Sequence, residues 1–203
     1  MIYTEEAGAG FILAGLTMNG AGKIFGVSAL TAFELSPHGK GGWKSSVIHT
    51  FAGYPKDGSY AYGTPVRDKK GNIYGTTQEG GKSDYGTVYK LTRLKKRWQY
   101  QILYEFTGGP KDGYYPFAGV TLDKAGNIYG TTALQNQSGF GTVFELEAPV
   151  GEGKYTESLI FTFNNTDGSQ PLGGLLFGSG NQLYGTTYSG GSSGNGIVFA
   201  IAP

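Results

Sequence analysis

An internal repeat runs through this sequence and limits the folds that it can adopt. Residues 71–77 and 126–132 both read Gly-Asn-Ile-Tyr-Gly-Thr-Thr, and related segments occupy residues 22–28 and, with one extra residue, 180–187. A second signature, Gly-Thr-Val followed by Tyr or Phe, occupies residues 86–89 and 141–144, with variants at 31–33 and 196–199. Two signatures that recur with one period of roughly 50–55 residues indicate four tandem copies of one unit.

Each copy is predicted to form one small antiparallel sheet. In the third copy, turn residues separate strand-like runs at 118–123, 127–132, 142–147 and 156–163. The chain has 37 glycines interleaved with 15 Tyr, 12 Phe and 2 Trp, which favours many tight turns between aromatic strands over a disordered linker. No segment has helical periodicity with caps. One four-stranded sheet per copy is typical of the blade of a β-propeller.

The two ends of the chain predict how the sheets close. Fourth strands are expected at 48–51, 103–106 and 160–163, whereas the last copy ends at a third strand. Residues 2–4 supply the missing strand, and this pairing removes two exposed sheet edges. We therefore expect one all-β domain over 1–203, a four-bladed β-propeller with four antiparallel strands per blade, closed by the N-terminal strand 2–4. The copies are expected at about 5–51, 52–106, 107–163 and 164–203. An open stack, or half of an eight-bladed dimer, is the alternative.

Composition narrows the classes of partner. The 16 Lys and Arg balance 15 Asp and Glu, so we expect no nucleic-acid partner, and no apolar run is long enough for membrane insertion. There is no cysteine and the only imidazoles are His38 and His49, so neither a metal nor a cofactor is predicted. The first residues lack a basic region followed by an apolar run, so no signal peptide is expected in this sequence. Localisation and oligomeric state stay open.

The repeated motifs resemble a known family. Gly-Asn-Ile-Tyr-Gly-Thr-Thr followed by Gly-Gly and Gly-Thr-Val-Phe, with Asp-Gly and Pro upstream, is similar to the bacterial tandem repeats called GloVer repeats. The resemblance covers essentially the whole chain, although the first copy departs from it at residues 25–28. It implies a repeat fold and an extracellular or surface setting. It carries no catalytic residues over to this sequence.

Two classes of loop are expected on one face around the propeller axis. The first, at 51–63, 106–119 and 163–174, carries an Asp-Gly pair in each copy; the second, at 78–85, 133–140 and 188–195, is rich in Gly, Ser, Asn and Gln. Each Asp either fixes its own turn or joins a carboxylate cluster that binds a polar ligand. The first copy has Gly8 in place of the Asp and lacks the second loop, which predicts a lower quadrant beside Glu5 and Glu6. The candidate ligand-binding residues are Asp57, Asp112, Asp167, Glu5, Glu6, Tyr60, Tyr115, Gln78, Gln135 and Tyr188.

No catalytic motif of known spacing is present, and catalytic residues are not assigned. The leading hypothesis is a binding module that takes a polar small molecule or glycan, with carbohydrate favoured, on the loop face. The first alternative is a glycoside hydrolase or lyase that uses the carboxylates at the channel mouth, for which a raised carboxyl pKa in a cleft is the discriminating feature. The second is a structural or protein-interaction repeat.

Overall fold

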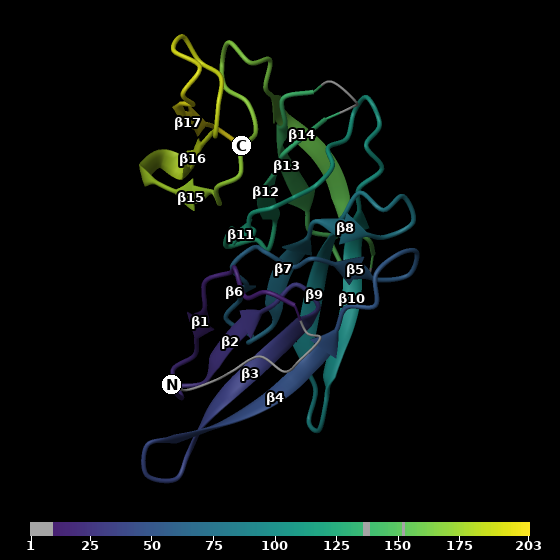
Figure 1. The fold of residues 1–203 in the computed structure, drawn as a ribbon, viewed down its shortest axis with the longest axis vertical. Coiled ribbons are helices and arrows are strands. Elements are labelled where there is room, and N and C mark those ends of the chain that lie inside the picture. The colour runs from purple at the N-terminus through teal and green to yellow at the C-terminus, as the bar shows by residue number, and fades with distance from the viewer. Residues whose placement is uncertain (1–9, 136–138, 152) are drawn as a thin grey trace.

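The computed structural model describes residues 10–135, 139–151 and 153–203 and shows a succession of four antiparallel sheets (Figure 1). Within these ranges the only helical segment is a short 3-10 turn, Ser179–Asn181, so the chain is all-β. The strands of the first sheet are β1 (Thr17–Met18), β2 (Ile24–Val27), β3 (Thr31–His38) and β4 (Gly42–Thr50). The second sheet holds β6 (Val66–Arg67), β7 (Ile73–Thr77), β9 (Thr87–Arg93) and β10 (Trp98–Glu105).

The third sheet holds β11 (Thr121–Leu122), β12 (Ile128–Thr132), β13 (Thr142–Glu147) and β14 (Thr156–Thr162). The fourth has three strands, β15 (Leu176–Phe177), β16 (Leu183–Thr186) and β17 (Val198–Ile201). A separate short pair joins β5 (Gly58–Ser59) to β8 (Glu79–Gly80) in the second copy. The prediction of one sheet per copy is confirmed. The first strand of the third copy is shorter than predicted, because only two of its residues pair with β12.

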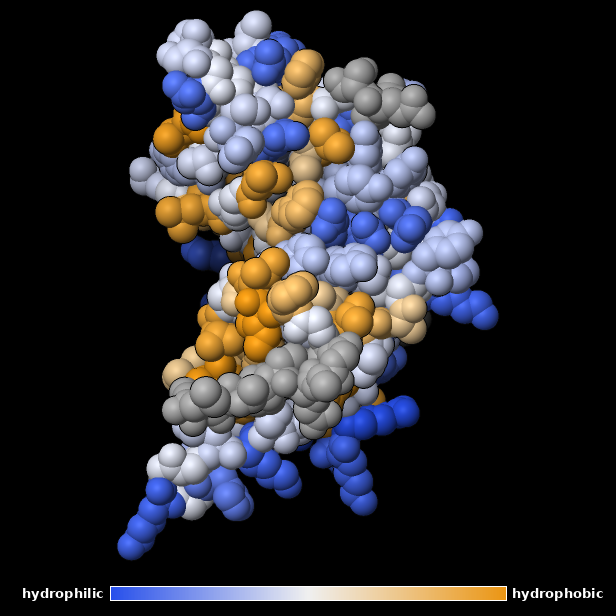
Figure 2. All heavy atoms as spheres, in the orientation of Figure 1, coloured by the Kyte–Doolittle hydropathy of each residue, from blue (hydrophilic) through white to orange (hydrophobic). Residues whose placement is uncertain are grey.

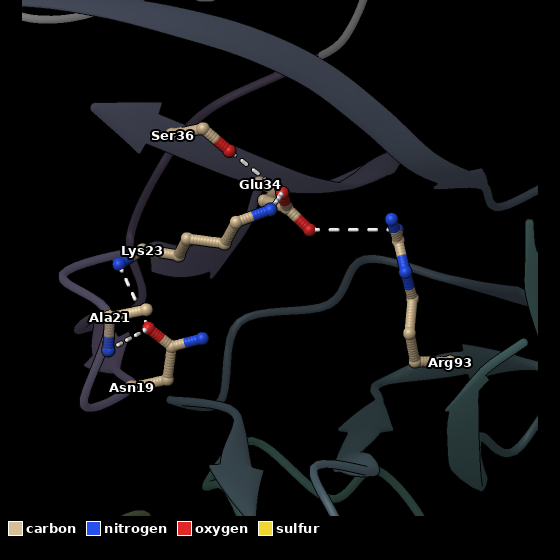
Figure 3. Close-up of polar contacts among 6 residues, drawn as sticks. All are labelled: Asn19, Ala21, Lys23, Glu34, Ser36 and Arg93. Carbon is tan, nitrogen blue, oxygen red and sulfur yellow. Dashed lines mark hydrogen bonds and ion pairs between the residues drawn. The ribbon is translucent and has the colours of Figure 1, made fainter. Parts of the chain in front are cut away.

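In the first three sheets, the turn between the first two strands depends on an Asp or Asn side chain. Asp123 Oδ1 accepts hydrogen bonds from the backbone N–H groups of Gly126 (2.7 Å) and Asn127 (2.9 Å). Asn19 does the same in the first copy, where its Oδ1 accepts from Ala21 and Lys23 (Figure 3). Gly126 has a φ of 98°, which a residue with a side chain rarely adopts. These requirements explain why the turn sequence recurs.

The two sequence signatures meet in the centre of each sheet. Gly75 of β7 pairs with Tyr89 of β9, and Gly130 of β12 pairs with Phe144 of β13. The aromatic ring lies over the glycine so closely that a side chain there would overlap it. The glycine of the first signature therefore makes room for the aromatic residue of the second.

Three of the four hydrophobic clusters among the described residues lie between consecutive sheets, and the fourth lies on the first sheet alone. Ile73, Leu91 and Tyr89 of the second sheet pack with Phe25 and Val27 of the first. Equivalent clusters join the second sheet to the third and the third to the fourth. Because β7 and β12 are covered on both faces, all five residues of each are buried. Consecutive copies therefore stabilise one another by hydrophobic burial.

The outer face of the last sheet is exposed among the described residues, whereas Ile24, Phe33 and Leu35 on the outer face of the first sheet are buried. Val198 is 78% exposed, whereas its counterparts Val88 and Val143 are fully buried. Leu176 on the last sheet and Leu16 beside the first sheet are also exposed. Hydrophobic residues gather over both end sheets on the left side of Figure 2. The predicted closing strand, residues 2–4, lies outside the described residues.

Within the described ranges, no helix has the length and apolar character that crossing a membrane requires.

Candidate ligand-binding site

Three loop residues with left-handed backbone connect consecutive copies. Tyr60, Tyr115 and Gln170 occupy the same place in successive loops, with φ values of 59°, 58° and 54°. The Tyr115 N–H donates to Tyr85 O (3.0 Å) of the second copy, and its carbonyl accepts from Ala133 N (3.0 Å) of the third. Left-handed backbone at a residue with a side chain costs about 1–3 kcal/mol and persists where surrounding contacts hold it. Two of the predicted ligand-binding residues, Tyr60 and Tyr115, are thus fixed in position on the loop face.

Tyrosines gather around these two positions. Tyr85, Tyr114 and Tyr115 are mutual neighbours, with ring centroids 5.0–5.9 Å apart. Tyr60 lies 5.9 Å from Tyr62, which stacks on Phe117 at 6.4 Å. Burial raises the pKa of Tyr62, and so do Tyr60 and Glu79. Each of these tyrosine rings presents an apolar body and a polar hydroxyl.

Glu79 pairs across the short β5–β8 ladder with Ser59, the neighbour of Tyr60, and its charge acts on tyrosines of both groups. Its carboxylate raises the pKa of both Tyr62 and Tyr115, after the larger effect of burial. Burial, and then the negative charge of Asp84, raise the pKa of Glu79 itself. Among the described residues, no side chain forms a hydrogen bond or ion pair with Glu79, so its oxygens are available to a ligand. We call Tyr60, Tyr62, Glu79, Tyr85, Tyr114 and Tyr115 the tyrosine–glutamate cluster.

Glu79 and Tyr85 were missed as site residues by the sequence analysis. Both fall within the predicted loop 78–85. Glu79 pairs with Ser59, and the equivalent pairs in the third and fourth copies are Tyr114 with Leu134 and Ser169 with Ser189. The residues equivalent to Glu79 are therefore Leu134 and Ser189, and neither is acidic. The signal that could have identified Glu79 is therefore its uniqueness among the copies. A site present in one copy out of four is a departure from the repeat pattern.

The predicted aspartates of the first loop class hold their own loops. Asp57 accepts hydrogen bonds from Ala52 N (3.0 Å) and Gly58 N (2.7 Å), and it is buried. Asp112, also buried, accepts from both the N–H and the hydroxyl of Thr107, each at 2.7 Å. These bonds are the turn-fixing role that the sequence analysis gave as one of two possibilities.

Asp167 accepts a hydrogen bond from Asn164 N at 2.9 Å and so fixes its loop in a similar way. The glycine after each Asp is needed for close packing, since a side chain at Gly113 would overlap Thr132 and one at Gly58 would overlap Thr77. The Asp-Gly pair is thus accounted for by loop structure in all three copies.

The other predicted residues are spread over the loops. Gln78 follows β7 at the edge of the cluster and its N–H donates to Tyr60 O (3.0 Å). Gln135 Nε2 donates to Pro110 O at 2.8 Å. Tyr188 is 70% exposed in the last copy. Glu5 and Glu6 lie outside the described residues.

A central hollow of about 430 Å³ is lined by all four copies. Leu16 comes from the first copy, Pro65 from the second, Val120 from the third and Leu172 from the fourth. None of the predicted ligand-binding residues among those described lines it, and its walls are mainly glycine backbone and apolar side chains. Among the described residues, no three His, Asp or Glu side chains come together as a metal site.

The repeated sheets and the loops that link them define an all-β tandem-repeat protein. The chain belongs to the Gloeobacter/Verrucomicrobia repeat family, which matches residues 7–203. This confirms the resemblance found in the sequence. No curated protein matches the chain.

Proposed function

We propose that the protein is a non-catalytic binding module that takes a neutral oligosaccharide on the tyrosine–glutamate cluster. The observation that carries this proposal is Glu79, a half-buried carboxylate without an internal partner among the described residues, which pairs with Ser59 beside Tyr60 and acts electrostatically on Tyr62 and Tyr115. Tyrosine rings provide flat apolar surfaces for the faces of sugar rings. A carboxylate provides acceptors for sugar hydroxyls.

The rigidity of the cluster supports binding of a polar ligand. Tyr60 and Tyr115 are held through their own backbone hydrogen bonds to neighbouring copies. Preorganised side chains lose less conformational entropy when a ligand binds. The cluster therefore suits a ligand that offers several weak contacts, as a sugar does.

The experiment is a titration of neutral oligosaccharides, first screened on a glycan array, into the wild-type protein and two matched variants. Tyr85→Ala removes a ring of the cluster, and Phe140→Ala removes the ring at the equivalent position of the next copy. The two positions are equivalent because the Phe140 carbonyl accepts from Gln170 N as the Tyr85 carbonyl accepts from Tyr115 N. We expect binding to weaken at least about tenfold in Tyr85→Ala and to change by less than about twofold in Phe140→Ala. Absence of binding at millimolar oligosaccharide, or an equal loss in both variants, would overturn the proposal. Cleavage of the bound oligosaccharide would instead favour the hydrolase or lyase alternative.

We further propose that the four sheets are the blades of a closed four-bladed β-propeller. Support comes from the central hollow, to which every copy contributes its first strand or the residues before it. Neighbouring copies are also linked there, since Gly15 N donates to Thr64 Oγ1 (2.8 Å) and Thr76 Oγ1 donates to Ala118 O (2.7 Å). In this arrangement, residues 2–4 complete the fourth blade.

Removal of residues 1–4 tests closure. A ring that depends on them should melt several degrees lower or aggregate through its open edge, because exposed strands pair with other chains. A shortened protein that remains monomeric with an unchanged melting temperature would rule out this role for the N-terminal strand.

A further inference from the structure

A second hollow lies on the side of the molecule formed by the hairpin turns. It has a volume of about 1770 Å³ and is walled by the second and third copies, with the turn at residues 177–181 of the fourth at one end. We call it the junction groove. Its volume exceeds the roughly 300–1,000 Å³ of a site for one small molecule, so it has room for several units of a polymer.

The charges that line the junction groove are unequal. Among the described residues of the lining, six cationic side chains face three acidic ones. The cations are Arg67, Lys69, Lys70, Lys90, Lys124 and Lys154, and the acids are Asp68, Glu105 and Asp123.

All three acids have partners, whereas the cations lack ion-pair partners. Asp68 accepts from Asn72 Nδ2 (2.7 Å) and Tyr74 Oη (3.1 Å), and Glu105 pairs with Lys82 at 2.7 Å. Asp123 is bound within its own turn. Across the described part of the chain, none of the six cations forms an ion pair. The groove therefore carries excess positive charge that a ligand can neutralise.

The repeat shows that one of these cations is a departure from the pattern. Lys90 pairs across the sheet with Tyr74, and the corresponding partners of Phe25 and Tyr129 are Glu34 and Glu145. In the first copy, Glu34 binds Lys23 (2.5 Å) and lies 3.7 Å from Arg93 (Figure 3). In the third copy, Glu145 accepts a hydrogen bond from Tyr129 Oη at 2.6 Å. Only the second copy places a cation at this position.

Arg67 is a second departure, because the residues in its place in the other copies are Met18, Leu122 and Phe177. Its guanidinium lies over the Phe25 ring, 5.2 Å from the centroid. Its Nε is buried and has no hydrogen-bond acceptor. The Arg67 side chain lines the groove, where guanidinium N–H groups can donate to the anionic oxygens of a ligand.

We propose that the junction groove binds an acidic polysaccharide through Arg67, Lys90 and the neighbouring lysines. This site is separate from the tyrosine–glutamate cluster and does not depend on it. A polyuronate fits better than single-stranded nucleic acid, which needs exposed aromatic faces on which bases stack. Tyr74 is buried beneath Lys90, and the other aromatic rings of the lining, Tyr104, Tyr155 and Phe177, are partly buried against the hydrophobic clusters between the sheets.

The test uses polygalacturonate, dextran as a neutral polymer and a thymidine oligonucleotide, each titrated into the full chain at low and physiological salt. The groove variant is Arg67→Leu with Lys90→Glu, which installs the side chains that the third copy carries and should therefore fold. The control is Lys95→Glu with Lys96→Glu, a larger change of charge in the same copy at two positions outside the groove lining. Melting curves check that both variants are folded.

We expect polygalacturonate, but not dextran, to bind through the groove. Its affinity should fall at least about tenfold in the groove variant and with added salt, since screening weakens exposed charge contacts. The control should bind within about threefold of wild type, because its charges act from a distance. Absence of binding at low salt, an equal loss in both variants, or tighter binding of the oligonucleotide would overturn the proposal. Binding of neutral oligosaccharides at the tyrosine–glutamate cluster should be unchanged in the groove variant.

Discussion

Asp112, in the loop that links the second sheet to the third, interacts electrostatically with Glu157 of β14, and each has one carboxylate oxygen buried without a hydrogen-bond partner. Burial, and then the charge of Asp112, raise the pKa of Glu157 to about 7. The corresponding place at the previous junction holds Asp57, whose neighbours are His49, at 3.0 Å, and Tyr100. There, burial is outweighed by hydrogen bonds, mainly from His49, and the pKa of Asp57 is lowered. One junction thus stabilises a charged carboxylate and the other a protonated one.

The raised pKa of Glu157 predicts that stability falls as pH rises. The folded state keeps this proton up to about pH 7, whereas the unfolded chain loses it near pH 4.5. Unfolding therefore releases a proton between these values, and the free energy of unfolding should decrease by about 2–3 kcal/mol across that window, after allowance for partial exposure.

Denaturant titrations at pH 4.5 to 8 on Glu157→Gln and Glu147→Gln measure this effect. Glu147 is exposed and serves as the control. Glu157→Gln should flatten the pH dependence and be more stable than wild type at pH 8, while Glu147→Gln should follow wild type. If the free energy of unfolding of Glu157→Gln depended on pH as steeply as that of wild type, Glu157 would be excluded as the source of the pH dependence.

Tyr89→Phe is expected to stabilise the protein. Tyr89 is fully buried and its hydroxyl has no hydrogen-bond partner, whereas the other copies have Phe33, Phe144 and Phe199 in its place. Removal of an unpaired buried hydroxyl should raise the free energy of unfolding by about 1–2 kcal/mol and the melting temperature by a few degrees. Phe144→Tyr, the reverse change in the third copy, should lower both. Thermal and denaturant unfolding of the two variants provide the measurement. A lower stability of Tyr89→Phe than of wild type would contradict the prediction.

Gly113→Ala is expected to destabilise the protein because the new methyl group would overlap Thr132. Relief of this overlap requires the loop or the end of β12 to move, at a cost of about 1–3 kcal/mol. Gly20→Ala is the control, since no atom lies within 4 Å of a methyl group there. Denaturant unfolding should separate the two variants. Equal effects would mean that close packing is not the reason for the Asp-Gly pair.

Val198→Asp distinguishes a closed ring from an open row of sheets. In the described part of the chain Val198 is 78% exposed, and an open row should accept Asp at little cost. In a closed ring, Val198 should be covered as Val143 is, and Val198→Asp should lower the free energy of unfolding by several kcal/mol. Val143→Asp is the control, because it should lower stability by a similar amount in a closed ring and in an open row. Melting temperatures of the two variants give the answer.

The sheets could be predicted from the sequence because their signals repeat. The Gly of Tyr-Gly and the aromatic of Gly-Thr-Val-aromatic are cross-strand partners, as at Gly130 and Phe144, so each copy carries its pairing register in its own sequence. The turn at Asp123 was likewise predictable, because its side chain binds the backbone only a few residues away.

The candidate sites were harder to predict because they depend on differences between copies and on contacts across junctions. The electrostatic interaction between Asp112 and Glu157 joins a linking loop to the last strand of the third sheet, and nothing in the sequence pairs these two residues. Glu79 and Lys90 are single departures from the repeat, and a search for recurrence passes over them. The Asp-Gly pairs attracted attention because they recur, and their recurrence reflects loop structure.

The backbone links at Tyr60, Tyr115 and Gln170 bear on how the molecule unfolds. The backbone N–H of each residue donates a hydrogen bond to the preceding copy, and its carbonyl accepts one from the following copy. A sheet therefore cannot separate from its neighbour without breaking these bonds. A sheet on its own would expose the face that forms most of its core, and its intrinsic stability should be low. In repeat proteins, cooperativity comes from the coupling between neighbours. Here that coupling dominates, so the four copies should melt together in one transition rather than fray one by one.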